Sequence, residues 1–284
     1  MACGTQDMNK PKMKVKTLLY AVALSSVAAL ITLVLSNSVS PDRPVQAAVM
    51  SDERPPGVPS NAISSGDLNT SAHSWSSIHD GGTIGSGSGW TKYPFSVGGI
   101  GNAREFYMTY KDRGAGERWS TNVAHNAGEY THFFLDGYVY FPSTVTKEIL
   151  NLEMDVNTVT EAGETYILAT QCAGTVKTWE YAFTVGHLDH WWSVSSMHCD
   201  PSTWAPNVWH HVQIAEYRNA NGTVTHEWVA LDGVTQIWNN DGTKTASHYN
   251  SWIPGDIDIN YQMEGAAASG EVISYTHDWI VWRW

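Results

Sequence analysis

The chain has 284 residues, of which 42% are hydrophobic and only 15% are charged. This composition excludes a mainly disordered chain, a coiled coil and a collagen-like fibre, and it suffices for a buried core. The formal net charge of −12 repels phosphate, so nucleic acid is not predicted as a partner. Aromatic residues are in excess, because 14 Trp and 13 Tyr outnumber 6 Phe. Trp and Tyr are the amphipathic rings used against hydroxylated partners.

Residues 1–47 have the pattern of an export signal. Lysines at positions 10, 12, 14 and 16 precede an apolar run from Leu18 to Leu35, and small residues follow at Val45-Gln46-Ala47. This order predicts a signal peptide that is cleaved after Ala47. The alternative is an uncleaved membrane anchor, because the run approaches the ~18–20 residues that span a bilayer. We expect a secreted, periplasmic or cell-surface protein that meets a membrane only through this segment.

Two stretches that are rich in small and polar residues follow the export signal. Residues 48–75 contain many Pro, Ser, Asn and Gly residues, which predicts a linker or an arm lying on a domain surface. Residues 81–101 are rich in Gly but lack a following helical pattern and a Gly-Lys-Ser/Thr ending. We therefore predict turns between strands there, and not a phosphate-binding loop.

Period-two alternation of apolar and polar side chains recurs after residue 48, whereas sustained helical periodicity does not. Six segments are predicted as strands: Ile149–Asn157, Trp179–Val185, Val208–Arg218, Thr223–Gly233, Asp256–Glu264 and Val272–Trp284. Strands that are separated by polar turns, without helices to cover a parallel sheet, predict an all-β antiparallel jelly-roll sandwich over residues 76–284.

Cys172 and Cys199 are the two cysteines that lie beyond the export signal. In an oxidising compartment such a pair is predicted to form a disulfide. The alternative is a metal site that combines Cys199 with His187, His190 and His198, but this set lacks paired Cys-x-x-Cys spacing. No cofactor is predicted.

The hairpin region and the C-terminal strand resemble a known superfamily. The chain resembles the hairpin of laminin G-like and concanavalin A-like domains at Trp209-His210-His211-Val212-Gln213-Ile214, Arg218, Asn221-Gly222 and Leu231-Asp232-Gly233. The ending, Asp278–Trp284, is similar to the closing strand of laminarinase-type glucanases in that superfamily. The chain also resembles secreted bacterial proteins without an assigned activity at Gln171-Cys172, Trp209–Ile214 and Gln262-Met263-Glu264-Gly265. The resemblance spans about residues 75–284 and implies a concanavalin A-like jelly roll, a fold that hosts lectins, hydrolases, lyases and adhesion modules.

Two predicted strands carry acidic and amide side chains on one face, without any cation. These residues are Asn151, Glu153, Asp155 and Asn157 in the first strand and Asp258, Asn260, Gln262 and Glu264 in the second. If the two strands are neighbours in one sheet, they line a groove whose acceptors and amide donors suit sugar hydroxyls. The alternative is an ordinary solvated sheet face.

Hydrolysis is the first enzymatic hypothesis. The glucanase resemblance implies that Glu153 is the nucleophile and Asp155 its electrostatic helper, but the acid/base position of that motif is occupied by Asn157, which cannot donate a proton. Glu153 and Asp155 are expected about 6.6 Å apart along the strand, near the lower edge of the ~6.5–9.5 Å range of inverting glycosidases. The alternative is an ordinary acidic strand or a vestigial site.

The second enzymatic hypothesis is β-elimination on a uronic-acid polymer. His211, Gln213 and Tyr217 share one strand face with Arg218 nearby, and jelly-roll lyases of the alginate type use these residue types. Their order differs from the lyase motifs, and the net negative charge disfavours an anionic substrate. The alternative is that these residues pack the hairpin.

Aromatic rings are expected to stack on the apolar faces of sugar rings. The candidates are Trp179, Tyr181, Trp191, Trp192, Trp204, Trp238 and Trp252. A role in the sandwich core is the alternative for Trp179, and it is also expected of Trp228, Trp279 and Trp282. The glucanase resemblance further implies a structural calcium ion near the closing strand, where Asp278 is the one matching carboxylate.

These observations together predict an exported, lectin-like protein that binds a neutral or weakly charged carbohydrate. Its expected ligand-binding residues are Asn151, Glu153, Asp155, Asn157, Gln171, Trp179, Tyr181, His211, Gln213, Asn260, Gln262 and Glu264. A glycan-cleaving enzyme and a structural or adhesion protein of the cell envelope are the alternatives.

Overall fold

The computed structural model describes residues 54–79, 85–161, 163, 165–185, 189–219, 223–238, 243–245 and 253–284. The side chains of residues 183–185, 189–193 and 243–245 lie outside this description, and so does the predicted signal peptide, residues 1–47. Across the described ranges the chain is almost entirely β-strand, and helix is limited to two short 3-10 turns, Ala127–Glu129 and Pro201–Thr203. Within them, no helix is long and apolar enough to cross a membrane.

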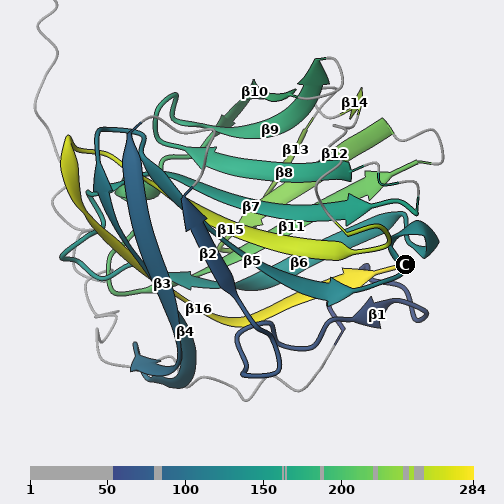
Figure 1. Ribbon diagram of the computed structural model, residues 1–284, viewed down its shortest axis with the longest axis horizontal. Helices are drawn as coiled ribbons and strands as arrows, with labels where there is room; N and C mark the ends of the chain where they lie inside the picture. The colour runs from purple at the N-terminus through teal and green to yellow at the C-terminus, as the bar shows by residue number, and fades with distance from the viewer. Residues whose placement is uncertain are drawn as a thin grey trace, which may run out of the picture. The chain divides into compact units, whose positions relative to one another are not determined.

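A seven-stranded antiparallel sheet forms one layer of the sandwich. Its strands, in spatial order, are β10 (Asp189–His198), β9 (Thr178–Val185), β8 (Thr165–Ala173), β7 (Ile149–Val159), β15 (Ile257–Gly265), β5 (Gly116–Ala124) and β2 (Ser76–His79). In Figure 1 the strands from β9 to β5 run side by side in front of the second sheet.

A nine-stranded antiparallel sheet forms the other layer. Its main path is β13 (Val234–Ile237), β12 (Thr223–Leu231), β11 (Trp209–Arg218), β6 (His132–Tyr140), β16 (Ser269–Arg283), β4 (Ile100–Lys111) and β3 (Ser86–Val97). Two short strands complete it: β1 (Ile63–Ser64) pairs with β16, and β14 (Thr243–Thr245) pairs with β12. The two layers confirm the predicted all-β antiparallel jelly-roll sandwich.

The core between the sheets is built from the apolar half of the period-two pattern. Leu152, Met154 and Val156 of β7 pack there together with Trp179 and Trp279, as predicted. The prediction was wrong for Trp228 and Trp282, which join a second apolar cluster with Phe134, Ala215, Val58 and Ala62. That cluster is separate from the core because Trp282 and Phe134 point away from it, on the outer face of the nine-stranded sheet.

The six predicted strands are present with shifts of at most three residues at either end. The prediction of turns in the Gly-rich stretch was correct for Gly98 and Gly99, whose φ angles are +57° and +83°, but wrong for residues 86–89, which belong to β3. Close packing explains the glycines in that strand. A Cβ on Gly89 would lie 2.6 Å from Cγ of Glu117 and 2.8 Å from the Trp119 ring.

Residues 54–75 lie against the sandwich as an arm, which was one of the two structures expected of the Pro- and Ser-rich stretch. Ser64 of β1 pairs with Trp282 of β16. Leu68 and Asn69 are fully buried, and the Thr276 hydroxyl donates a hydrogen bond to Asn69 Oδ1. The rest of the stretch, residues 48–53, lies outside the described residues.

A disulfide joins Cys172 to Cys199, with 5.2 Å between their Cα atoms, and confirms that prediction. It connects β8 to the segment that follows β10. Because its sulfur is in this bond, Cys199 is not a free thiol for the alternative metal site, while His187 and the side chain of His190 lie outside the described residues.

Candidate ligand-binding site

The two strands with acidic and amide side chains are neighbours in the seven-stranded sheet. Glu153 of β7 is paired with Gln262 of β15, and Asp155 is paired with Asn260. Because Leu152 and its apolar neighbours face the core, these polar side chains lie on the outer face of the sheet. We call this surface the polar face and define it as Glu180, Gln171, Asn151, Glu153, Asp155, Asn157, Asp258, Asn260, Gln262, Glu264, Arg118 and Ser120.

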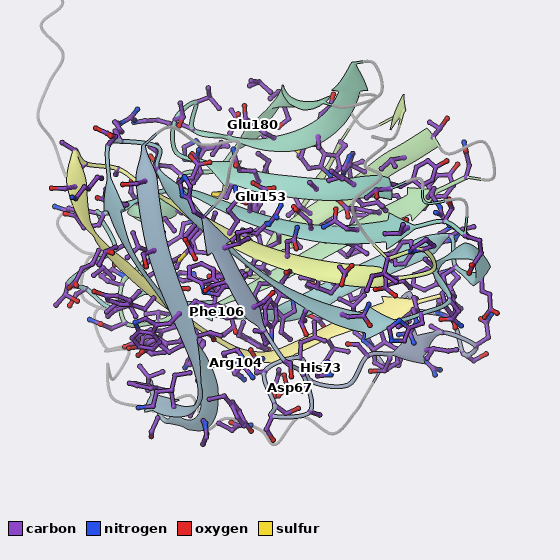
Figure 2. All side chains as sticks on the ribbon, in the orientation of Figure 1. Asp67, His73, Arg104, Phe106, Glu153 and Glu180 are labelled. Carbon is purple, nitrogen blue, oxygen red and sulfur yellow. A yellow bond between two sulfur atoms is a disulfide. The ribbon has the colours of Figure 1, made fainter. Side chains whose placement is uncertain are left out.

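One row of paired residues crosses five strands of the polar face. From β9 to β5 it runs Glu180, Gln171, Glu153, Gln262, Arg118. Gln171 Nε2 donates to Glu180 Oε2 at 2.9 Å, and Gln262 Nε2 donates to Glu153 Oε2 at 2.8 Å. Glu153 is only 6% exposed, so this row is not an ordinary solvated face. Glu153 and Glu180 are labelled in Figure 2.

Adjacent residues on the polar face repeat the pairing of an amide with a carboxylate. Asn260 Nδ2 donates to Asp155 Oδ2 at 3.3 Å, and Asn151 Nδ2 donates to Glu264 Oε2 at 2.7 Å. Each carboxylate therefore receives at least one fixed N–H donor. This alternation orients the oxygen atoms of the acidic residues across the sheet.

Several buried polar atoms of the polar face lack a hydrogen-bond partner among the described residues. They are Asp155 Oδ1, Asn157 Oδ1 and Nδ2, Gln171 Oε1, Asn260 Oδ1 and Arg118 Nε. Buried polar atoms are normally paired, because leaving one unpaired costs about 1–3 kcal/mol. Such a concentration on one face is typical of a surface that a ligand or solvent completes.

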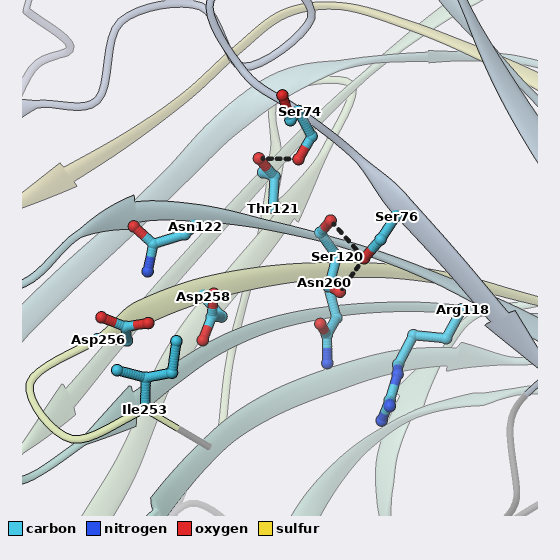
Figure 3. A pocket seen from close by; sticks show the side chains of 10 residues that line it. All are labelled: Ser74, Ser76, Arg118, Ser120, Thr121, Asn122, Ile253, Asp256, Asp258 and Asn260. Atoms are coloured by element: carbon cyan, nitrogen blue, oxygen red, sulfur yellow. Dashed lines mark hydrogen bonds between the residues drawn. The ribbon is translucent and has the colours of Figure 1, made fainter. Parts of the chain in front are cut away.

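A cavity of about 380 Å³ adjoins the polar face beside β5 and β15. Figure 3 shows the residues that line it: Ser74, Ser76, Arg118, Ser120, Thr121, Asn122, Ile253, Asp256, Asp258 and Asn260. Its size is near the lower end of the ~300–1,000 Å³ range of small-molecule pockets. Sequence reasoning missed Arg118, Ser120 and Asn122, although their alternation along β5 was a signal of an outward polar face.

Burial governs the electrostatics of the site. It raises the pKa of Asp155 to about 7, an effect reinforced by the charge of Glu216 and opposed by hydrogen bonds from Glu153 and Asn260. The hydrogen bond between Glu153 and Asp155 brings their carboxyl groups into direct contact. The expected spacing of about 6.6 Å along the strand stays a prediction.

Asp258, in the cavity, is the second carboxyl group of the site whose pKa is raised. Burial, and then the charge of Asp256, raise its pKa to about 6, against a hydrogen bond from Asn122 and the charge of His125. Asp256 itself contacts His125, with 2.5 Å between Oδ1 and Nδ1. The cavity therefore has two neighbouring carboxyl groups at one end.

The predicted aromatic ligands do not lie at this site. Trp179, Tyr181, Trp204 and Trp238 are buried in the core, so the prediction that they stack on a sugar was wrong. Strand parity explains the first two, because Glu180 between them faces outward and its two neighbours must then face inward. The side chains of Trp191 and Trp192, and the whole of Trp252, lie outside the described residues.

His211 and Gln213 belong to β11 in the nine-stranded sheet, so they cannot share a site with Glu153. His211 Nε2 contacts Asp136 Oδ1 at 2.5 Å. Its ring stacks on Tyr138 with centroids 4.5 Å apart, and Tyr138 stacks in turn on His277 at 4.7 Å. We call this surface the aromatic face and define it as the outward rings of Tyr138, Tyr140, Trp209, His211, Tyr275 and His277.

The residues proposed for a lyase are not assembled. Arg218 is buried, and its guanidinium donates to Thr158 Oγ1 at 3.1 Å and to the carbonyl oxygen of Ala127 at 3.0 Å. It points into the sandwich, whereas His211 on the same strand points out, so Arg218 cannot neutralise a substrate carboxylate beside His211. Tyr217 instead stacks on His132 at 5.1 Å.

The calcium site implied by the glucanase resemblance stays a prediction. Asp278 Oδ2 contacts Nδ1 of His277 at 3.1 Å. Within the part of the chain that the structure describes, no group of three or more His, Cys, Asp or Glu side chains is placed to hold a metal ion.

No family model matches the sequence, and no curated protein matches it. Solved structures with a similar arrangement include the alginate lyase vAL-1 from Chlorella virus, with 10% identity, a TM-score of 0.42, and 68% of this chain and 89% of that chain covered. Arcelin-5, a lectin-like defence protein from Phaseolus vulgaris, has 9% identity and a TM-score of 0.38 over 74% of this chain and 98% of its own. The CBM2 module of the evolved Dit of Lactobacillus casei BL23 phage J-1 has 13% identity and a TM-score of 0.34 over 68% and 79%.

Proposed function

We propose that the protein is an exported, lectin-like carbohydrate-binding protein of the concanavalin A-like superfamily, and that its site is the polar face with the adjoining cavity. The observation that carries this proposal is the set of buried, unpartnered polar atoms on one sheet face beside an open cavity. Sugar hydroxyl groups both donate and accept hydrogen bonds, so one ligand class satisfies the amide and carboxylate atoms alike. The Cys172–Cys199 disulfide supports an oxidising compartment outside the cytoplasm.

Two observations favour binding over the alternatives. A purely structural sheet face gains nothing from polar atoms that stay unpaired at about 1–3 kcal/mol each. Hydrolysis by Glu153 and Asp155 is disfavoured because their carboxyl groups hydrogen-bond to each other and because Asn157, at the acid/base position, cannot donate a proton. The polar face is therefore suited to holding a sugar more than to cleaving one.

The test is a glycan array at neutral pH with the wild type, Glu153→Gln and the control Glu271→Gln. Glu271 is exposed on β16 of the other sheet, so its variant changes the net charge equally without touching the polar face. We expect Glu153→Gln to weaken binding about 10-fold or more, because hydrogen bonds to charged groups contribute about 1.5–3 kcal/mol. The control should bind like the wild type.

Two outcomes would contradict the proposal. Equal binding by Glu153→Gln and the wild type would place the site elsewhere. Reducing ends that the wild type releases and Glu153→Gln does not would mean that the polar face cleaves glycans. Denaturation curves of each variant show whether a loss of binding reflects a loss of folding.

A further inference from the structure

We propose that the cavity beside the polar face recognises a protonated amino group, so that the preferred glycan carries free amino sugars, as in an oligomer of glucosamine. This inference rests on the carbohydrate-binding function proposed above and names the class of sugar. It rests on the unequal distribution of charged residues along the cavity and on Oδ1 of Asn260, a hydrogen-bond acceptor without a donor among the described residues.

The cavity is acidic at one end. Asp256 and Asp258 lie together there, whereas Arg118 lies toward the opposite side of the cavity (Figure 3). Asp258 accepts a hydrogen bond from Asn122 but forms no ion pair with any cation of the described ranges. Asp256 has the imidazole of His125 as its partner, and that side chain is 78% exposed. One carboxylate at the acidic end is thus left for a cationic ligand.

Acceptors without a donor outnumber donors without an acceptor. Among the described residues of the polar face, four oxygen atoms lack a donor and two nitrogen atoms lack an acceptor. One of those oxygens, Oδ1 of Asn260, belongs to a residue that lines the cavity and is 2% exposed, while the Nδ2 of the same amide is held by Asp155. Among the described residues that line the cavity, the unpartnered donor is Nε of Arg118, which lies toward the opposite side, so the acidic end favours a ligand group that donates hydrogen bonds and does not accept them.

An ammonium group has this character, because it brings three donors, no acceptor and a positive charge. N-acetylation replaces it with an uncharged amide that has one donor and one acceptor. A neutral hydroxyl group also donates and accepts. A free amine is hence the substituent that matches both the carboxylate of Asp258, which forms no ion pair among the described residues, and the unpartnered Oδ1 of Asn260.

The remaining cavity walls suit the rest of a sugar. Ser76 and Ser120 present hydroxyl groups whose oxygens lie 3.2 Å apart. Ile253 is 67% exposed on the cavity wall and offers an apolar contact for the C–H face of a ring.

The inference is tested by measuring the affinity of the full chain for three oligomers of equal length, built from glucosamine, N-acetylglucosamine and glucose. The glucosamine oligomer is expected to bind at least 10-fold more tightly than the other two at pH 7. Its affinity should rise as the pH is raised through about 6, where Asp258 ionises beside Asp256 and His125, and fall at higher pH as the amino groups of the ligand lose their protons. Asp258→Asn should weaken its binding about 10-fold or more.

The matched control is Glu271→Gln, which removes the same charge far from the cavity. A glucosamine oligomer is a polycation and the protein has a net charge of −12, so equal weakening by both variants would mean non-specific attraction and would overturn the inference. Equal affinity for the glucosamine and N-acetylglucosamine oligomers would overturn it too, but would leave the carbohydrate-binding function standing. Binding to none of the three would overturn the inference, and the glycan array would then decide whether the carbohydrate-binding function stands.

Discussion

The outer faces of the two sheets arise from the same alternation of inward and outward side chains, but they differ in how far those side chains find partners within the protein. On the aromatic face the central groups complete one another: His211 is held by Asp136, His277 contacts Asp278, and both imidazoles stack on Tyr138. On the polar face, acids and amides pair, yet several of their buried atoms stay unpartnered within the described residues. The comparison teaches that the residues defined as the aromatic face leave no buried polar side-chain atom unpartnered and contribute stability, whereas the described polar face keeps unused hydrogen-bonding capacity.

The largest effect on the free energy of unfolding is expected from Asp155→Asn. This variant replaces an ionisable group of the polar face with a neutral amide. Burial raises the pKa of Asp155 from 3.8 to about 7, so the folded state holds this proton more tightly than the unfolded state does. The contribution to stability is present below about pH 4 and is lost as the pH rises toward 7, by up to about 4 kcal/mol.

The measurement is the free energy of unfolding of both proteins at several pH values. We expect the wild type to lose stability between pH 4 and 7 more steeply than Asp155→Asn. Parallel curves for the two proteins would show that Asp155 does not titrate abnormally.

Tyr138→Ala tests the aromatic face and should have an intermediate effect. The ring is half-buried and stacked on both sides, so its loss is expected to lower the free energy of unfolding by about 2 kcal/mol. Tyr138→Phe is the control that keeps the ring, and glycan binding should be the same in both. Weaker glycan binding by Tyr138→Ala, with folding intact, would mean that the aromatic face also takes part in recognition.

Asn157→Leu should have the smallest effect on the free energy of unfolding. It sharpens the comparison of the two faces because the substitution is expected to stabilise the protein. Neither amide atom of Asn157 has a partner among the described residues, although the side chain is fully buried. An apolar side chain of similar size should therefore raise the free energy of unfolding by about 1 kcal/mol while weakening glycan binding. Destabilisation in chemical denaturation would reveal a structural role for the amide.

The sequence predicted which segments of the site are strands better than it predicted which residues belong to the site. Alternation located β7 and β15 because each keeps one apolar and one polar half over its whole length. The pairing of Cys172 with Cys199 could be predicted for a simpler reason, because two cysteines allow only one intramolecular disulfide. Nothing in the period-two pattern says which strands become neighbours, so the contribution of β5 through Arg118 and Ser120 was not foreseen.

Alternation also assigns residues to a face without saying which sheet that face belongs to. His211 and Gln213 therefore seemed equal to Glu153 as ligand-binding candidates, although they lie on the other side of the molecule. Trp179 and Tyr181 were ambiguous for a related reason, since a large amphipathic ring fits a core as well as a sugar. The outward direction of Glu180 decides between the two, and that direction depends on contacts between strands distant in the sequence.

The arm of residues 54–75 has a practical consequence for how the protein is presented to a ligand. Arg54 lies 5.6 Å from the centre of the Trp282 ring, and Val58 and Ala62 are buried with Phe134, so the described chain starts on the nine-stranded sheet. A tether attached at Arg54 itself would start on the side opposite Glu153. Immobilisation of a chain that begins at Arg54 should thus orient the polar face toward solution, whether the support is a biosensor chip or a bead.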